Sequence, residues 1–295
     1  MLIRCVVLAV GSLSFVGMSI LAFAQEAGET RVAEKSDGAW KPLFDGKSLE
    51  GWYTQIQNLK KNDDPEKFFH VEDGVIHVYK DQAEGTKVPN GFIATEKEYS
   101  SFDLRMEFKW GTKKFKPRMM AVRDAGLLYH VRPPDVVWPR SVECQIQEGD
   151  VGDCFTVRGA RLTTSVEDAA INTPSGVKTL PRYKAEKDGG ETRTLGNSGI
   201  QRIVKSSMVE RDGWNVIEVA VRGSESAEHI VNGKTVFRAR DLKELKPGDA
   251  LADKSKPGAA ESDWVPLSRG RIALQCEYAE VFYRRIEIRE IATSE

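Results

Sequence analysis

The stretch Ser101-Phe-Asp-Leu-Arg-Met-Glu-Phe-Lys-Trp110 sets apolar and polar residues in strict alternation. Side chains of a β-strand point alternately to opposite faces, so one face of this segment is apolar and the other is charged. Such a strand packs one face on a core and turns the other toward water. The same alternation returns in three later segments, at 215–222, 271–278 and 284–289. The chain therefore predicts antiparallel strands with one buried and one solvated face.

Turn signals separate several short apolar runs. Asp73-Gly74 and Asn232-Gly233 each lie between two such runs, and these residue pairs tolerate the positive φ that a tight hairpin needs. No ten-residue stretch shows the apolar stripe of a helix. Strands are sparse at about 159–202 and at 246–263, where we expect long surface loops. Together these patterns predict an all-β fold, a two-sheet antiparallel jelly-roll sandwich.

Composition excludes several classes of partner and reaction. The chain has 295 residues with 43 basic and 44 acidic side chains, a net charge of −1, so nothing in the balance attracts nucleic acid or an anionic membrane. A glycine-rich phosphate loop, a His-Glu-x-x-His motif and a Gly-x-Ser-x-Gly motif are all missing from the sequence. Nucleotide-dependent chemistry, zinc proteolysis and α/β-hydrolase chemistry are therefore disfavoured.

The first 24 residues have the pattern of a secretory signal peptide. Arg4 supplies the positive end, an apolar run follows over 5–21, and Ala22-Phe-Ala24 matches the small-x-small cleavage rule. We expect cleavage after residue 24, a periplasmic or extracellular location and no membrane contact after removal of the signal. Residues 25–38 are polar and predict a flexible linker. Residues 39–293 then form a single domain.

Three cysteines remain after the predicted cleavage. Cys144 and Cys276 each lie on the apolar side of an alternating strand, where a free cysteine acts as a small hydrophobic residue. We expect them to be free. The alternative is a bridge between Cys144 and Cys154 across a short loop.

One strand has an unusual polar side. In Trp138-Pro-Arg-Ser-Val-Glu-Cys-Gln-Ile-Gln-Glu-Gly149, one face is apolar and the other carries Glu143, Gln145 and Gln147. Carboxylates and amides offer directed acceptors and donors, which suit a ligand rich in hydroxyl groups. The alternative is an ordinary solvated outer strand. We take these three residues as candidate site residues that line a hollow in a concave sheet face.

Two further strands add candidates to the same face. Alternation over Asp124-Ala-Gly-Leu-Leu-Tyr-His-Val131 puts Asp124, Gly126, Leu128 and His130 together. Gly126 would let a ligand ring approach the backbone. His130 is a candidate acid–base group, although a lone histidine is more often structural. Gln275 and Glu277 form another polar pair, and Trp138 offers a flat surface for stacking, or a core side chain.

Six ordered stretches resemble the 3-keto-disaccharide hydrolase domain family, which was long known only as a domain of unknown function. They cover about Trp40 to Ile291, and they are Pro42–Trp52, Gly91–Leu104, Asp124–His130, Trp138–Asp150, His229–Lys234 and Leu274–Arg284. The resemblance implies a jelly-roll sandwich of the concanavalin A-like lectin/glucanase type. It also implies action on glycosides oxidised at C3 of the sugar. Family members often have Asn-Ser-Gly where this chain has Asp124-Ala-Gly126.

A ketone at C3 acidifies the proton on C2, which a base can remove before the C1 substituent leaves. The candidates for that base are His130 and Glu143, with Gln145 and Gln147 as hydrogen-bond donors and Glu277 as a possible acid. Asp124, Gln275 and Trp138 complete the predicted substrate-binding set. No cofactor is certain from the sequence. A divalent metal ion is a possible one, with Asp124, His130 and Glu143 as candidate ligands.

Two other functions fit the same residues. One is a glycosidase with paired carboxylates that acts on unoxidised sugars. The other is a carbohydrate-binding jelly-roll module without catalysis, because this fold supports both activities. A 3-keto sugar or another carbohydrate is the ligand in each case.

Overall fold

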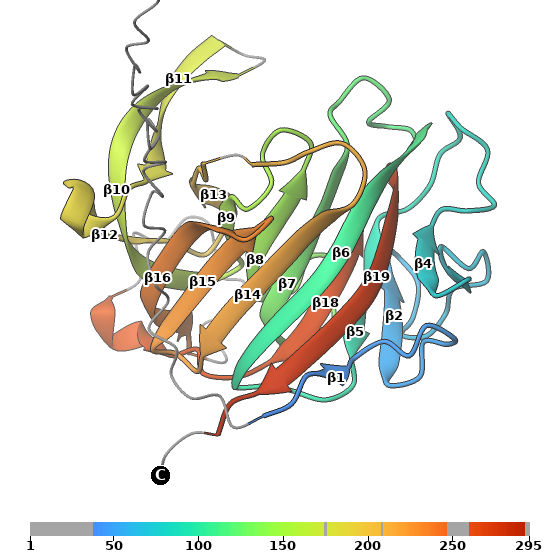
Figure 1. Ribbon diagram of the computed structural model, residues 1–295, viewed down its shortest axis with the longest axis horizontal. Helices are drawn as coiled ribbons and strands as arrows, with labels where there is room; N and C mark the ends of the chain where they lie inside the picture. The colour runs from blue at the N-terminus through green and yellow to red at the C-terminus, as the bar shows by residue number, and fades with distance from the viewer. Residues whose placement is uncertain (1–37, 174–175, 208, 247–259, 293–295) are drawn as a thin grey trace, which may run out of the picture. The chain divides into compact units, whose positions relative to one another are not determined.

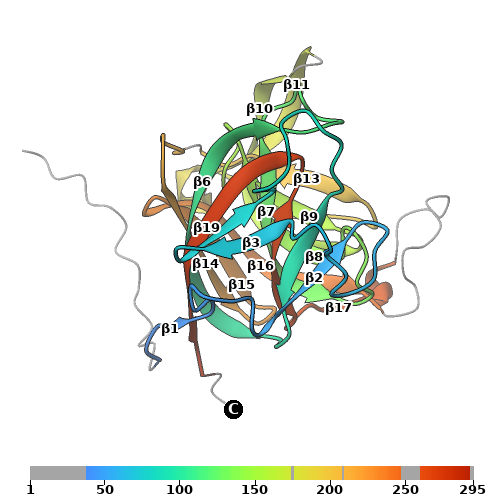
Figure 2. The same ribbon diagram turned by 90° about the vertical axis from the view of Figure 1, so that its right-hand side faces the viewer.

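The computed structural model describes residues 38–173, 176–207, 209–246 and 260–292. The predicted signal peptide (1–24) and all of the predicted linker except residue 38 lie outside these residues. The described chain is built of β-strands with two single-turn 3-10 helices at Glu186–Asp188 and Glu261–Asp263. No helix of the described residues is long and apolar enough to span a bilayer. The strands form two antiparallel sheets, which confirms the predicted jelly-roll sandwich (Figures 1 and 2).

The larger sheet has twelve strands, and Figure 1 looks onto its central strands. Nine of them follow one hydrogen-bonded path: β11 (Gly176–Tyr183), β10 (Ala160–Thr173), β16 (Lys234–Leu245), β15 (Ser226–Val231), β14 (Asn215–Arg222), β6 (Ser101–Lys114), β19 (Ala279–Glu290), β4 (Val75–Val78) and β3 (Phe69–Glu72). Three short strands join at the sides: β1 (Lys41–Pro42) on β19, β12 (Glu191–Leu195) on β10, and β17 (Trp264–Pro266) on β16.

The smaller sheet has seven strands, which lie behind the larger one in Figure 1. Their order is β13 (Ile200–Val204), β9 (Cys154–Val157), β8 (Arg140–Gln147), β7 (Asp124–Arg132), β18 (Arg271–Cys276), β5 (Gly91–Thr95) and β2 (Trp52–Ile56). The strands with the predicted polar residues, β7, β8 and β18, are therefore neighbours in the middle of this sheet.

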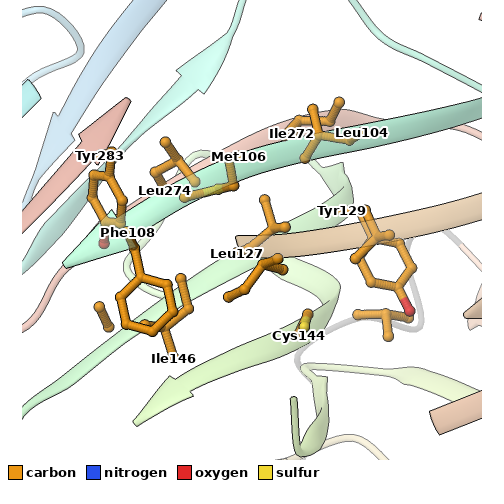
Figure 3. Close-up of a cluster of buried hydrophobic side chains, with 14 of the residues drawn as sticks. Leu104, Met106, Phe108, Leu127, Tyr129, Cys144, Ile146, Ile272, Leu274 and Tyr283 are labelled. Atoms are coloured by element: carbon orange, nitrogen blue, oxygen red, sulfur yellow. The ribbon is translucent and has the colours of Figure 1, made fainter. Parts of the chain in front are cut away.

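The core lies between the two sheets and consists of the predicted apolar faces. β6 contributes Leu104, Met106 and Phe108, and the opposing sheet contributes residues from β7, β8 and β18 (Figure 3). Each fully buried side chain of this size stabilises the fold by about 1.5–3 kcal/mol. Cys144, Cys154 and Cys276 are buried and free, as the alternation predicted for the first and last of them.

Two local predictions are confirmed and one is wrong. Asp73 and Asn232 have φ of 47° and 50°, and the glycines that follow them also have positive φ, so both pairs make the expected hairpin turns. The loop expected at 159–202 is instead mostly strand, because β10 and β11 form a long hairpin that β12 joins. Much of this hairpin is solvated on both faces, so its sequence carries no apolar alternation. Most of the second expected loop (246–263) lies outside the described residues.

Candidate functional site

The polar residues lie on the outer face of the seven-stranded sheet, on the side away from the core. The strand register places the outward residues of β18, β7 and β8 in three rows across the sheet. In that strand order, the rows are Glu277, Asp124 and Gln147; Gln275, Gly126 and Gln145; and Ala273, Leu128 and Glu143. The structure thus brings together six of the predicted site residues. We call these three rows the polar face.

This face is polar without being solvated. The exposed fractions of Asp124 and Glu143 are 5%, and those of Gln145 and Gln275 are 4% and 2%. Acidic and amide side chains are seldom buried this deeply unless they are paired or functional. The alternative prediction, that β8 is an ordinary solvated outer strand, is therefore wrong.

Arg118 joins two carboxyl groups at one end of the polar face. It lies in the segment between β6 and β7, and its Nη1 donates to Asp124 Oδ2 at 2.7 Å and to Glu277 Oε1 at 2.5 Å. Burial raises the pKa of Glu277 to about 7, with the Asp124 charge adding to the rise and Arg118 opposing it. The pKa of Asp124 is raised by burial as well. Glu277 is therefore poised to exchange a proton near neutral pH.

Glu143 lies over the backbone of Gly126. A Cβ atom on Gly126 would be 2.2 Å from Glu143 Oε1 and 2.7 Å from Gln275 Oε1, so these two side chains fill the space above the glycine. The sequence predicted that this space admits a ligand ring, and that prediction is wrong. Burial, then the charges of Glu277 and Asp124, raise the pKa of Glu143 well above its usual value. Burial and the neighbouring negative charges therefore favour the protonated form of Glu143.

The two outer glutamines of β8 are anchored to Asp124. Gln145 Nε2 donates to Asp124 Oδ1 at 3.2 Å, and Gln147 Nε2 donates to Asp124 Oδ2 at 2.8 Å. Arg202 on β13 donates to Gln147 Oε1 at 2.9 Å, and its guanidinium lies 5.2 Å from the ring centroid of Phe155. A continuous chain of hydrogen bonds therefore runs from Arg202 through Gln147 and Asp124 to Arg118 and Glu277.

The polar face ends in an apolar cluster on the same side of the sheet. Trp138 and Val137 are partly buried against residues of four strands: Tyr53, Phe92, Ala94, Leu128, Val131 and Ala273. The Tyr53 hydroxyl donates a hydrogen bond to Asp135 Oδ1 at 2.7 Å, which connects the segment before Trp138 to β2. Leu128 is the cross-strand partner of Glu143, so Trp138 belongs to the cluster that borders the polar face.

His130 does not share this face. The register of β7 shifts between Tyr129 and Arg132, and His130 has φ of 52°, which marks a β-bulge. The bulge turns His130 inward, where its Nε2 donates at 2.9 Å to the carbonyl of Gly223, in the turn between β14 and β15. The His130 ring meets the edge of Phe102 on β6 of the larger sheet. Burial lowers its pKa to about 4, so the ring is neutral. The predicted pairing of His130 with Glu143 is wrong.

Replacement of His130 by asparagine should therefore affect stability and not the polar face. Asparagine accepts positive φ, but the Gly223 carbonyl would lose its donor at a buried site, which costs about 1–3 kcal/mol. We expect a lower urea midpoint and unchanged binding of sugar per folded molecule, measured by titration calorimetry. If the variant kept its stability but no longer bound sugar, His130 would be a binding residue, contrary to this prediction.

The predicted metal-ligand set does not assemble. Asp124 and Glu143 share the polar face, but the bulge removes His130 from them. Across the residues described, no group of three or more His, Cys, Asp or Glu side chains is placed to hold a metal ion. A divalent metal ion stays a prediction, and this trio is not its ligand set.

Sequence reasoning missed three residues of the site. Arg118 lies outside any alternating segment, so no periodic signal marks it. Arg202 and Phe155 belong to β13 and β9, which lie in or beside the region expected to be loop; Phe155 is the cross-strand partner of Glu143. The signal that could have found the two arginines is charge compensation, because carboxyl groups crowded on one face of a sheet require nearby cations.

The family follows from a comparison over most of the chain. A family model described as the 3-keto-alpha-glucoside-1,2-lyase-like domain matches residues 39–289. The chain belongs to this family. The match spans β1 to all but the last residue of β19, hence every residue of the polar face, and it agrees with the resemblance found in the sequence. Membership places the chain among carbohydrate-active jelly-roll domains. No curated protein is similar enough in sequence to count as a relative.

Solved structures share the arrangement of strands more loosely. A Parabacteroides distasonis protein provisionally named a glycosyl hydrolase has 20% identity and a TM-score of 0.47, with 86% of this chain and 94% of that chain covered. The carbohydrate-binding module CBM66 from Bacillus subtilis has 10% identity and a TM-score of 0.36, with 81% and 96% covered. Similarities of this size leave the function to be argued from the site itself.

Proposed function

We propose that the protein is an exported enzyme that cleaves 3-keto-glycosides at the bond between C1 and the aglycone oxygen. The observation that carries the proposal is the different environment of two carboxyl groups on the polar face: Glu277 is paired with Arg118, and Glu143 is buried over Gly126. Burial raises the pKa of Glu143 well above its usual value, whereas Arg118 opposes the rise at Glu277, whose pKa is about 7. Carboxyl groups whose pKa values are pushed apart in one site can serve as an acid and a base.

The first step is removal of the proton on C2 by the Glu277 carboxylate. The C–H electron pair moves into a C2–C3 double bond, and the C3 carbonyl becomes an enolate oxygen. Arg118, which contacts Glu277, supplies positive charge on the side where negative charge develops. These roles reverse the sequence-based hypothesis, in which Glu143 was a candidate base and Glu277 an acid.

The second step is departure of the aglycone. The enolate reforms the C3 carbonyl, a C1–C2 double bond forms, and the C1–O bond breaks with its electrons on the aglycone oxygen. Glu143 donates its proton to that oxygen, which avoids an alkoxide leaving group. Addition of water across the C1–C2 bond would complete a net hydrolysis, and release of the unsaturated sugar would complete a lyase reaction.

Parallel assays with a 3-keto-glucoside and its unoxidised parent test this proposal. We expect aglycone release only from the keto compound, because only the ketone acidifies the C2 proton. Release from both would indicate a glycosidase with paired carboxylates. Binding of either sugar without release from the keto compound would indicate a binding module. Repeating the assays with a chelator would show whether a metal ion takes part, and the N-terminus of secreted protein would test cleavage after residue 24.

The proposed base also fixes the pH dependence of kcat/KM. Only ionised Glu277 can accept the C2 proton, so we expect kcat/KM to rise with pH to a midpoint near the Glu277 pKa of about 7. Arg118 lowers that pKa, so replacement of Arg118 by methionine should move the acid limb to higher pH. The measurement is a pH series of kcat/KM for both proteins at constant ionic strength. If the acid limb of kcat/KM in Arg118→Met stayed at the wild-type pH or moved to lower pH, Glu277 would not be the base.

A further inference from the structure

Two amide oxygens of the polar face have no hydrogen-bond partner among the residues that the structure describes. Gln145 and Gln275 are each more than nine-tenths buried, and the Oε1 atom of each is unpartnered. Buried polar atoms of native proteins nearly always have a partner, because an unpaired one keeps the full cost of leaving water. An unpaired acceptor shielded from bulk water on this face is therefore a position for a donor group of a ligand.

Neighbouring carboxyl groups fix the orientation of both amides. Gln145 Nε2 donates to Asp124 Oδ1 at 3.2 Å, and Asp124 is ion-paired with Arg118, so the NH₂ end must face that carboxylate. Gln275 forms a hydrogen bond with Glu143, and a carboxyl oxygen of Glu143 accepts from the Gln275 NH₂ group whether or not Glu143 carries its proton. The two Oε1 atoms are consequently held as acceptors before any ligand arrives.

Gln147 differs from these two although it shares their strand face. Its Nε2 donates to Asp124 Oδ2 at 2.8 Å and its Oε1 accepts from Arg202 at 2.9 Å. Both ends of this amide are therefore engaged by protein. The sequence grouped Gln145, Gln147 and Gln275 as substrate-binding residues, and the hydrogen bonds divide them.

We infer that Gln145 and Gln275 accept hydrogen bonds from two hydroxyl groups of the bound sugar, while Gln147 only positions Asp124. This deepens the proposed function and rests on it in taking a sugar as the ligand. A site with two fixed acceptors selects glycosides whose corresponding hydroxyls are free. It rejects analogues that lack them, because a buried acceptor is then left unpaired.

Binding of unoxidised sugars tests this inference apart from turnover. Titration calorimetry with methyl glucoside and its 2-, 3-, 4- and 6-deoxy analogues gives an affinity ratio for each hydroxyl. In the wild-type protein we expect two of the four analogues to bind about 10-fold or more weakly than the parent. Gln145→Met and Gln275→Met should each bind the parent weakly and lose the discrimination against one of those two analogues.

Two further variants separate recognition from structure. Gln55 is a buried glutamine on β2, on the same side of the sheet, whose Nε2 donates to the Leu59 carbonyl at 3.0 Å, so Gln55→Met should keep the wild-type ratios. Gln147→Met should weaken all five sugars alike. Wild-type ratios in both Gln145→Met and Gln275→Met, or no discrimination in the wild-type protein, would overturn the inference. Turnover of a 3-keto-glucoside is assayed in parallel, so that discrimination without turnover would refute only the proposed reaction.

Discussion

Replacement of Glu143 by glutamine should reduce turnover of a 3-keto-glucoside by about 10²–10⁴-fold, the usual range for loss of a positioned acid. The fold should be unaffected. Burial favours the protonated form of the native carboxyl, and glutamine is a neutral side chain of the same shape. The measurements are kcat with saturating substrate and the midpoint of urea unfolding.

The pH dependence of stability gives this variant a second signature. Burial raises the pKa of Glu143 in the folded protein above its value of 4.5 in the unfolded chain. The folded state therefore holds a proton that the unfolded state releases, and stability from this group is lost as pH rises above 4.5. Glu143→Gln removes that loss, so the variant should be at least as stable as the wild type at pH 7.5. A variant that was clearly less stable at that pH would count against a protonated Glu143, and so against the acid role.

Alternation was a reliable guide where strands are regular and packed on one face. Gln145 and Gln147 alternate with Cys144 and Ile146, and the structure places the two pairs on opposite sides of β8. The same rule placed Gln275 and Glu277 correctly on their side of the sheet, beside Asp124. The core, the hairpin turns and the polar face are all consequences of this period-two pattern and of turn residues with positive φ.

The rule fails at the residue where the backbone breaks the period. One inserted residue at His130 reverses the faces that follow, so Val131 joins the outer apolar cluster although alternation assigned it to the core. Nothing local in the sequence announces the bulge, since a positive φ at histidine is set by tertiary contacts. Arg118 could not be predicted as a site residue for a different reason. Its position depends on how a segment without periodicity folds back onto Asp124 and Glu277.

Replacement of Gly126 by alanine should have the other large effect on activity. The added Cβ would lie 2.2 Å from Glu143 Oε1 and 2.7 Å from Gln275 Oε1, closer than atoms can approach. Both side chains are buried, so neither can move aside without displacing its neighbours. A shift of about 1 Å in a reacting group can cost about 10²-fold in rate, and we expect a loss of that order in kcat. Gly199→Ala is the matched control, because its Cβ would meet only Asn197 Oδ1, at 3.1 Å, on an exposed side chain.

The same substitution in the Glu143→Gln background shows whether the two residues act together. Suppose that Gly126 affects kcat only by leaving room for the Glu143 carboxyl. In that case, alanine at position 126 lowers kcat no further once the carboxyl has been replaced. The double variant should then be scarcely slower than Glu143→Gln alone, a strongly non-additive result. Losses that multiplied would mean that Gly126 serves the reaction through something other than Glu143. The wild type, the two single variants and the double variant should have similar urea midpoints, because Gly126 and Glu143 lie on the outer face and outside the core between the sheets. Similar midpoints would exclude unfolding as the cause of lost activity.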